Sequence, residues 1–132
     1  MLLWNISPLK ADTLSVQNLY TNPTAQTLPE ALILHNSENP CENCLPAINM
    51  IIAVLKANYK HKLHAYLIDT AKHPEFADTF QAHAPLTLVI VRISDGASFG
   101  YKKLIGLQSQ TDDKEYFSRR ITEFIDNFLG WD

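Results

Sequence analysis

Cys41 and Cys44 are the two cysteines of the chain, and they stand three positions apart in the segment Pro-Cys-Glu-Asn-Cys. A disulfide between them would close a very short loop. Because the entropy cost of closing a loop grows with its length, such a bond would constrain the unfolded chain little. The pair is therefore better suited to chemistry than to holding a fold together.

The segment that follows the cysteines has helical periodicity. Its apolar residues recur at helical spacing, namely Ile48, Ile51, Ile52, Leu55 and Tyr59. This spacing predicts a helix from about residue 41 to residue 60, with Pro46 near its start, where a missing N–H costs little. The free N–H groups and positive dipole end of a helix start stabilise a thiolate, so Cys41 is the predicted nucleophile. Cys44, about one turn further on, is the predicted resolving thiol.

Apolar runs on both sides of this helix predict the strands of one sheet. We expect strands at residues 31–34, 63–68, 86–93 and 98–105, and further helices at residues 73–81 and from about residue 111 towards the C-terminus. A long crossover joins the first two strands, which favours a parallel pair, and residues 94–97 form a hairpin turn. The prediction is an α/β fold with a central mixed β-sheet flanked by helices. A strand at residues 2–6, a short helix at 13–20 and a loop at 23–29 are expected before it.

Length, charge and hydropathy exclude several classes of protein. The 132 residues suit a single domain, and a net charge of -3 lacks the basic footprint of a nucleic-acid partner. No apolar run approaches the ~18 residues of a membrane span, so we expect no membrane partner. Residues 1–5 lack the charged start of a signal peptide, which favours a cytoplasmic location.

A C-x-x-C pair that opens a helix inside a βαβ unit is typical of thioredoxin-like redox proteins. Other segments extend the likeness over roughly residues 30–129: Ala-Leu-Ile-Leu before the motif, Ala84-Pro85 ahead of Leu-Thr-Leu-Val-Ile-Val, Asp95-Gly96, and Gly106. With these residues the chain resembles the thioredoxin family. The resemblance implies a single thioredoxin-like domain that acts as a thiol–disulfide oxidoreductase without a bound cofactor or metal. Its expected partners are disulfide-containing protein substrates and a recycling reductase or glutathione.

The resemblance also implies a substrate groove beside the cysteines. Pro85 would be cis and face the cysteine pair, and Ala84 would offer backbone hydrogen bonds to a bound peptide. Pro40, Glu42 and Asn43, which surround the cysteines in sequence, are expected to contact the substrate.

The chain departs from the family pattern at several positions. Pro40 stands where the family usually has tryptophan, Glu42 and Asn43 replace its commonest Gly-Pro pair, and Asn49 replaces its helix-kink proline. His35 stands where the family has a buried aspartate. These changes indicate altered redox tuning, since the Glu42 charge opposes a thiolate on Cys41 and His35 is suited to act as general base for Cys44.

Several alternatives remain open from the residues alone. His35 is equally suited to be a hydrogen-bonded histidine at a strand end, and Glu42 to stabilise a helix dipole. Pro85 is also suited to be an ordinary trans proline that opens a strand. A zinc site would need two more ligands, and the histidines lack finger-like spacing after the cysteine pair. The rival function is a non-enzymatic scaffold that docks a protein partner across the Pro85 groove.

Overall fold

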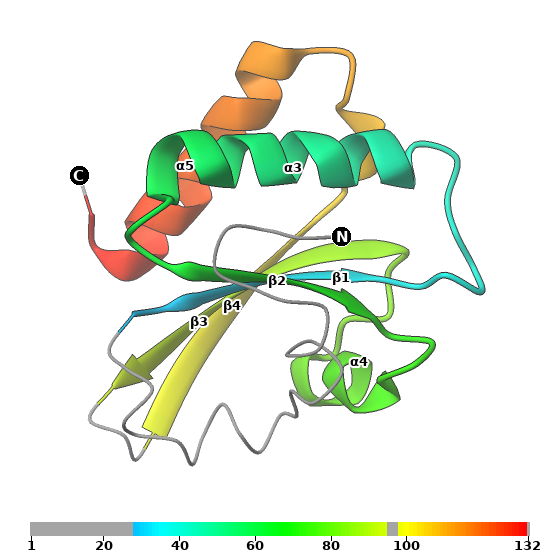
Figure 1. Ribbon diagram of the computed structural model, residues 1–132, viewed down its shortest axis with the longest axis horizontal. Coiled ribbons are helices and arrows are strands. Elements are labelled where there is room, and N and C mark those ends of the chain that lie inside the picture. The colour runs from blue at the N-terminus through cyan, green and yellow to red at the C-terminus, as the bar shows by residue number, and fades with distance from the viewer. Residues whose placement is uncertain (1–27, 95–97, 132) are drawn as a thin grey trace.

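A four-stranded sheet in the order β2-β1-β3-β4 forms the centre of the protein (Figure 1). The computed structural model describes residues 28–94 and 98–131. The strands are β1 (Glu30–His35), β2 (His64–Asp69), β3 (Leu86–Ser94) and β4 (Ser98–Ile105). β1 runs parallel to β2 and antiparallel to β3, and β3 and β4 are antiparallel. The predicted mixed sheet is therefore confirmed.

Helices cover both faces of this sheet (Figure 1). α3 (Cys44–Tyr59) and α5 (Lys114–Leu129) lie on one face, and the short α4 (Pro74–Phe80) lies on the other. A 3₁₀ turn, η2 (Leu107–Ser109), joins β4 to α5 and was not predicted. In the part of the chain that the structure describes, none of the helices has the length and apolar character needed to cross a membrane.

β1 is buried on both of its faces. Residues 31–34 are at most 1% exposed. Ile33 belongs to the core cluster under α3 and α5, whereas Leu32 and Leu34 belong to the cluster under α4. A strand covered on both sides has no polar face to present to water, which is why its sequence is a continuous apolar run. Each fully buried leucine or isoleucine contributes about 1.5–3 kcal/mol to the free energy of unfolding.

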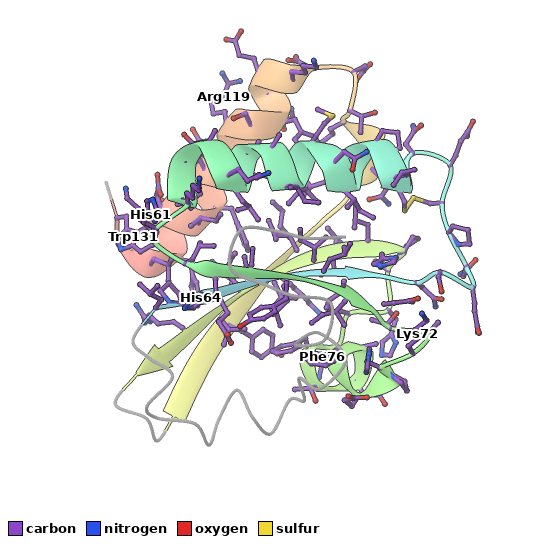
Figure 2. All side chains as sticks on the ribbon, viewed as in Figure 1. His61, His64, Lys72, Phe76, Arg119 and Trp131 are labelled. Atoms are coloured by element: carbon purple, nitrogen blue, oxygen red, sulfur yellow. A yellow bond between two sulfur atoms is a disulfide. The ribbon has the colours of Figure 1, made fainter. Side chains whose placement is uncertain are left out.

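The side chains between the sheet and α3 and α5 form the larger of the two cores (Figure 2). Three helix residues spaced by four, Phe117, Ile121 and Ile125, are fully buried there. This spacing places them on one face of α5, as the amphipathic pattern predicts. The helix begins where its acidic cap predicts, because the Asp113 carboxylate accepts a hydrogen bond from the Tyr116 N–H at 3.0 Å.

The main helix begins later than expected. The prediction of a helix from Cys41 is wrong at that end, because α3 starts at Cys44. Asn43 has φ -107° and ψ 18°, which is not helical, and asparagine is a favoured N-cap residue. Pro46 then takes the third position of the helix, where its missing N–H would have had no partner within the helix. The strand and helix expected at 2–6 and 13–20, and most of the hairpin turn at 94–97, lie outside the described residues.

Candidate active site

Cys41 and Cys44 form a disulfide at the N-terminal end of α3, seen as the yellow bond in Figure 2. Their Cα atoms are 5.2 Å apart, and the N–H of Cys44 donates to the carbonyl of Cys41 at 3.3 Å. Cys41 lies in the turn before the helix and is partly exposed, whereas Cys44 is 5% exposed and packs into the core under α3. The two cysteines are therefore unequally exposed, and Cys41 is the more accessible of the two.

The loop before β3 faces the cysteine pair. The Sγ atom of Cys44 lies 3.9 Å from the carbonyl oxygen of Pro85. The expectation of a cis Pro85 is wrong, since the described residues contain no cis peptide bond. An X–Pro bond prefers the trans isomer by about 0.5–1 kcal/mol, and this loop brings its carbonyl to Cys44 with the bond in that form.

One cavity of about 210 Å³ brings most of the predicted site residues together. Six of the eight line it: His35, Pro40, Cys41, Glu42, Cys44 and Pro85. The remaining wall is formed by Asn36, Ser37, Leu45, Ile48 and Leu67, none of which was predicted as a site residue. Leu45 is 64% exposed, an unusual exposure for a large apolar side chain. We call this space the disulfide cavity.

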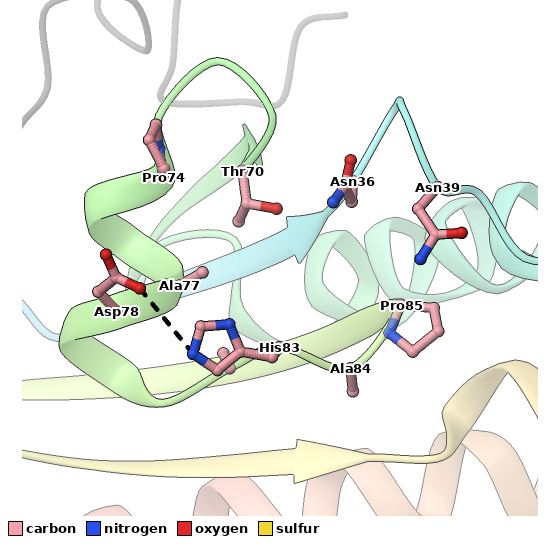
Figure 3. A pocket seen from close by; sticks show the side chains of 10 residues that line it. Asn36, Asn39, Thr70, Pro74, Ala77, Asp78, His83, Ala84 and Pro85 are labelled. Carbon is pink, nitrogen blue, oxygen red and sulfur yellow. Dashed lines mark ion pairs between the residues drawn. The ribbon is translucent and has the colours of Figure 1, made fainter.

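The other two predicted residues lie close to the disulfide cavity but do not line it. Asn43 is the exposed N-cap residue of α3, although its side chain makes no capping hydrogen bond. Glu42 is exposed just before that cap, so it is outside the first helical turn where a dipole-stabilising carboxylate was considered. Ala84 lines a second cavity, also of about 210 Å³, on the far side of Pro85 (Figure 3).

His35 ends β1 and lines the disulfide cavity together with both cysteines. The backbone carbonyl of His35 accepts two hydrogen bonds from Thr70, one from its N–H at 2.7 Å and one from the Thr70 hydroxyl at 3.0 Å. Burial lowers the pKa of the His35 imidazole below its usual 6.5, and the nearby Asp69 carboxylate opposes part of that change. The imidazole is therefore neutral near pH 7 and able to accept a proton.

Asp69 is a charged neighbour of His35 that the sequence reasoning missed. It is paired directly with His35 in the parallel register of β1 and β2. Its carboxylate accepts hydrogen bonds from the N–H groups of Ser37 and Ala71, both at 3.0 Å. Burial alone would raise the pKa of Asp69, but the hydrogen bonds from Ser37 and Ala71 and the charge of His35 hold it below its usual value. Its position in the sequence could have identified it. Asp69 directly follows the strand predicted at residues 63–68, and parallel strands end at the same edge of a sheet, where His35 also lies.

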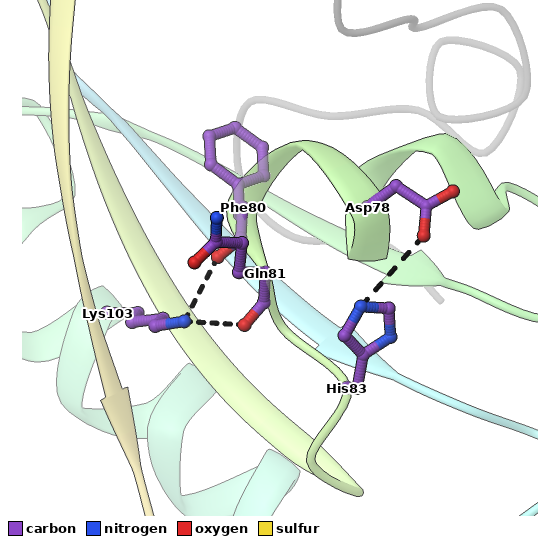
Figure 4. A network of polar contacts seen from close by, with 5 residues as sticks. All are labelled: Asp78, Phe80, Gln81, His83 and Lys103. Carbon is purple, nitrogen blue, oxygen red and sulfur yellow. Dashed lines mark hydrogen bonds and ion pairs between the residues drawn. The ribbon is translucent and has the colours of Figure 1, made fainter.

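Lys103 on β4 holds the end of α4, from which the chain runs to Pro85. Its Nζ donates to the carbonyl oxygens of Phe80, at 3.2 Å, and of Gln81 (Figure 4). Gln81 is the C-cap residue and has a left-handed conformation with φ 51°. A lysine at this place satisfies carbonyls that the helix leaves open and suits the negative end of its dipole.

Among the residues that the structure describes, no three His, Cys, Asp or Glu side chains gather as a metal site would require. Both cysteine sulfurs are engaged in the disulfide.

Comparison with known proteins identifies the fold. No family model matches the chain, and no curated protein matches its sequence. The fourth thioredoxin domain (Trx4) of ERdj5 matches with a TM-score of 0.59 and 10% identity, over 92% of this chain and 94% of that one. A full ERdj5 structure, form II, matches with a TM-score of 0.54 and 10% identity over 92% of this chain and 14% of its own length. Chloroplastic thioredoxin z matches at 13% identity, over 78% of this chain and 92% of its own, with a TM-score of 0.49.

Replacement of Lys103 by methionine should lower the free energy of unfolding by about 1 kcal/mol, because two carbonyls at the end of α4 lose a charged donor. Urea denaturation measures this difference. Lys102→Met is the matched control, since Lys102 is also exposed on β4 and alternates to the opposite face of the sheet. Equal stability of the two variants would contradict a capping role for Lys103.

The lowered pKa of His35 predicts a pH dependence of stability. The contribution of the neutral His35 side chain to the free energy of unfolding is complete above pH 6.5. It is lost as the pH falls from there through the lower pKa of the folded state, because the unfolded chain takes up the proton first. His35→Gln should therefore lose less stability than wild type between pH 7.5 and pH 5, measured by urea denaturation. His61→Gln, at an exposed position, should behave like wild type; a wild-type slope in His35→Gln would refute the prediction.

Proposed function

Starting from this thioredoxin-like fold, we propose that the protein is a thiol–disulfide oxidoreductase that works through the Cys41–Cys44 pair. One observation carries the proposal: the disulfide stands at the start of α3 with Cys41 partly exposed, Cys44 buried beside the Pro85 carbonyl, and a cavity lined by both. A structural disulfide gains nothing from this asymmetry. A redox pair needs it, because one sulfur must meet the substrate and the other must wait beneath it.

In the reducing direction the reaction has two exchanges. The Cys41 thiolate attacks one sulfur of a substrate disulfide; the S–S bond of the substrate breaks, and its other sulfur leaves as a thiolate that takes up a proton. Cys44 then loses its proton and attacks the Cys41 sulfur, which forms the Cys41–Cys44 disulfide and releases the second substrate thiol. Two electrons and two protons pass from the protein dithiol to the substrate, so no bound cofactor is needed.

The N-terminal position of the pair supports Cys41 as the attacking thiolate. The open N–H groups at the start of α3 and its dipole favour a negative charge there, and α3 has no acidic residue in its first turn. The exposed Glu42 next to Cys41 works against that charge. In the dithiol form the Cys44 thiol has the Pro85 carbonyl as a hydrogen-bond acceptor, which favours its protonated state until it is needed.

We assign to His35 the role of the base that accepts the proton of the Cys44 thiol. The imidazole lines the same cavity as both cysteines and is neutral near pH 7, so it can accept that proton in the second exchange. Asp69, paired with it across the strands, stabilises the imidazolium that forms.

The proposed partners follow from the chemistry. The substrates are proteins with accessible disulfides, and the oxidised pair is returned to the dithiol by a protein reductase or by glutathione in a cytoplasmic setting. A non-enzymatic scaffold that docks a partner across the Pro85 groove would present the same groove without turnover. An insulin-reduction assay separates the two functions, because only the oxidoreductase turns over.

Cys41→Ser should abolish catalysed reduction of insulin by dithiothreitol, because the accessible sulfur is lost. Cys44→Ser should also stop turnover but accumulate a mixed disulfide on Cys41, detectable by mass spectrometry after incubation with an aromatic disulfide probe. Insulin turbidity measures the activity. A wild-type rate equal to the reductant-only blank would remove the enzyme in favour of the scaffold.

His35→Gln should slow the second exchange by about 10²-fold at pH 7, the usual contribution of a positioned base. The measurement is the single-turnover lifetime of the mixed disulfide from pH 5.5 to 9. The wild-type rate should rise through the titration of His35, and this rise should disappear in the variant. His61→Gln should keep the wild-type profile. An unchanged pH profile in His35→Gln would leave His35 a structural residue.

A further inference from the structure

We infer that the cavity behind Pro85 is a second substrate subsite, which binds a basic side chain close to the reacting cysteine of the substrate. We call it the Asp78 cavity. The inference rests on the proposed function, because it describes the specificity of the same exchange reaction. Four observations carry it: the residues that the two cavities share, the contrast between their linings, the accessibility of one carboxylate, and the sign of the charge.

The Asp78 cavity and the disulfide cavity are neighbours that share part of their lining. Asn36 and Pro85 line both of them, so they form two compartments on either side of the Pro85 loop. Each has a volume of about 210 Å³, enough for one large side chain rather than a whole peptide. A substrate segment whose cysteine meets Cys41 therefore extends past Pro85, and its next side chains meet the second compartment.

The two compartments offer different chemistry. Around the cysteines the lining is largely apolar and includes Leu45, Ile48 and Leu67. The Asp78 cavity has polar side chains on opposite walls. Figure 3 shows Asp78 and His83 at one wall, with Thr70, Asn36 and Asn39 across from them. The first compartment therefore suits the apolar surroundings of a substrate cysteine, and the second suits a polar side chain.

The carboxylate of Asp78 is available to a ligand. Its contact in the structure is with His83, at 3.9 Å, and both side chains are more than two-thirds exposed, at 77% and 69%. A pair of that length in water contributes at most a small amount of binding free energy. An amino or guanidinium group of a substrate can approach the carboxylate more closely, and arginine can bind both oxygens at once.

The charges that line the two cavities determine which substrate charge is favoured. Glu42 is one of the residues that line the disulfide cavity, Asp78 is one of those that line the second cavity, and neither lining includes a lysine or an arginine. A disulfide flanked by basic residues is therefore attracted to both compartments. Glutathione disulfide, whose four carboxylates outnumber its two amines, is repelled by both. Within the proposed function, the preferred substrate is a disulfide in a basic peptide segment.

The test compares matched disulfide-linked peptide dimers that carry lysine or glutamate two residues before or two residues after the cysteine. Extended chains rise about 3.3 Å per residue, so such a side chain lies about 7 Å from the cysteine and on the same side of the chain. The measurement is the second-order rate constant with the fully reduced protein. In at least one placement the lysine peptide should react about five-fold faster than its glutamate partner, which corresponds to about 1 kcal/mol of exposed-charge interaction.

Asp78→Asn should bring that ratio close to the smaller value set by Glu42 alone, with each rate expressed relative to that of a neutral alanine peptide measured on the same variant. The matched control is Glu75→Gln, which removes an exposed carboxylate from the same helix without touching the cavity lining. It should keep the full ratio. Raising the salt concentration from about 0.05 M to 0.5 M should shrink the preference, because exposed charges are screened.

The outcomes separate the two claims. Equal rates for lysine and glutamate peptides in every placement, or a ratio that Asp78→Asn leaves unchanged, would overturn the subsite and leave the oxidoreductase in place. Failure of every peptide to react with the reduced protein would overturn both. A five-fold ratio that falls in Asp78→Asn and persists in Glu75→Gln supports the subsite.

Discussion

The position of β1, buried on both faces and paired on both edges, is the constraint on which the site depends. Its parallel register with β2 and antiparallel register with β3 place His35, Asp69 and Leu86 in one row across the sheet. The chain leaves β1 there to form the cysteine turn, and it enters β3 there from Pro85. The hydrogen-bond ladder joins these strand ends directly, and it thereby brings the disulfide, the histidine and the proline loop to one edge of the sheet.

This arrangement separates the redox pair from the stability of the fold. Loop-closure entropy gives a disulfide across so short a loop a contribution of about 2 kcal/mol to the free energy of unfolding, against about 4.7 kcal/mol for a 100-residue loop. The core under α3 and α5 is made by apolar burial that does not require the sulfur–sulfur bond, although Cys44 packs into it. Most of the burial that holds the scaffold together is therefore independent of the disulfide.

The patterns that succeeded are those in which one local rule decides the outcome. A strand covered on both faces is mostly apolar, so the runs at 31–34 and 86–91 marked β1 and most of β3. Asp113 marked the start of α5, because a carboxylate there satisfies a free N–H group. The predictions that were wrong concern places where two local preferences compete. The start of α3 moved from Cys41 to Cys44 because Asn43 breaks the helical conformation, and the family pattern suggested a cis Pro85 that the loop does not adopt.

The amino-acid sequence by itself determined the order of elements, the two-sided burial of β1 and the placing of a cysteine pair at a helix start, because each follows from the periodicity or the covalent spacing of nearby residues. The tertiary structure decided which cysteine is the more exposed, that Asp69 stands beside His35, and that the Asp78 cavity and the disulfide cavity share Pro85. These are relations between residues distant in the chain. They depend on strand register and loop packing, and no local pattern of side chains encodes a distance across the sheet.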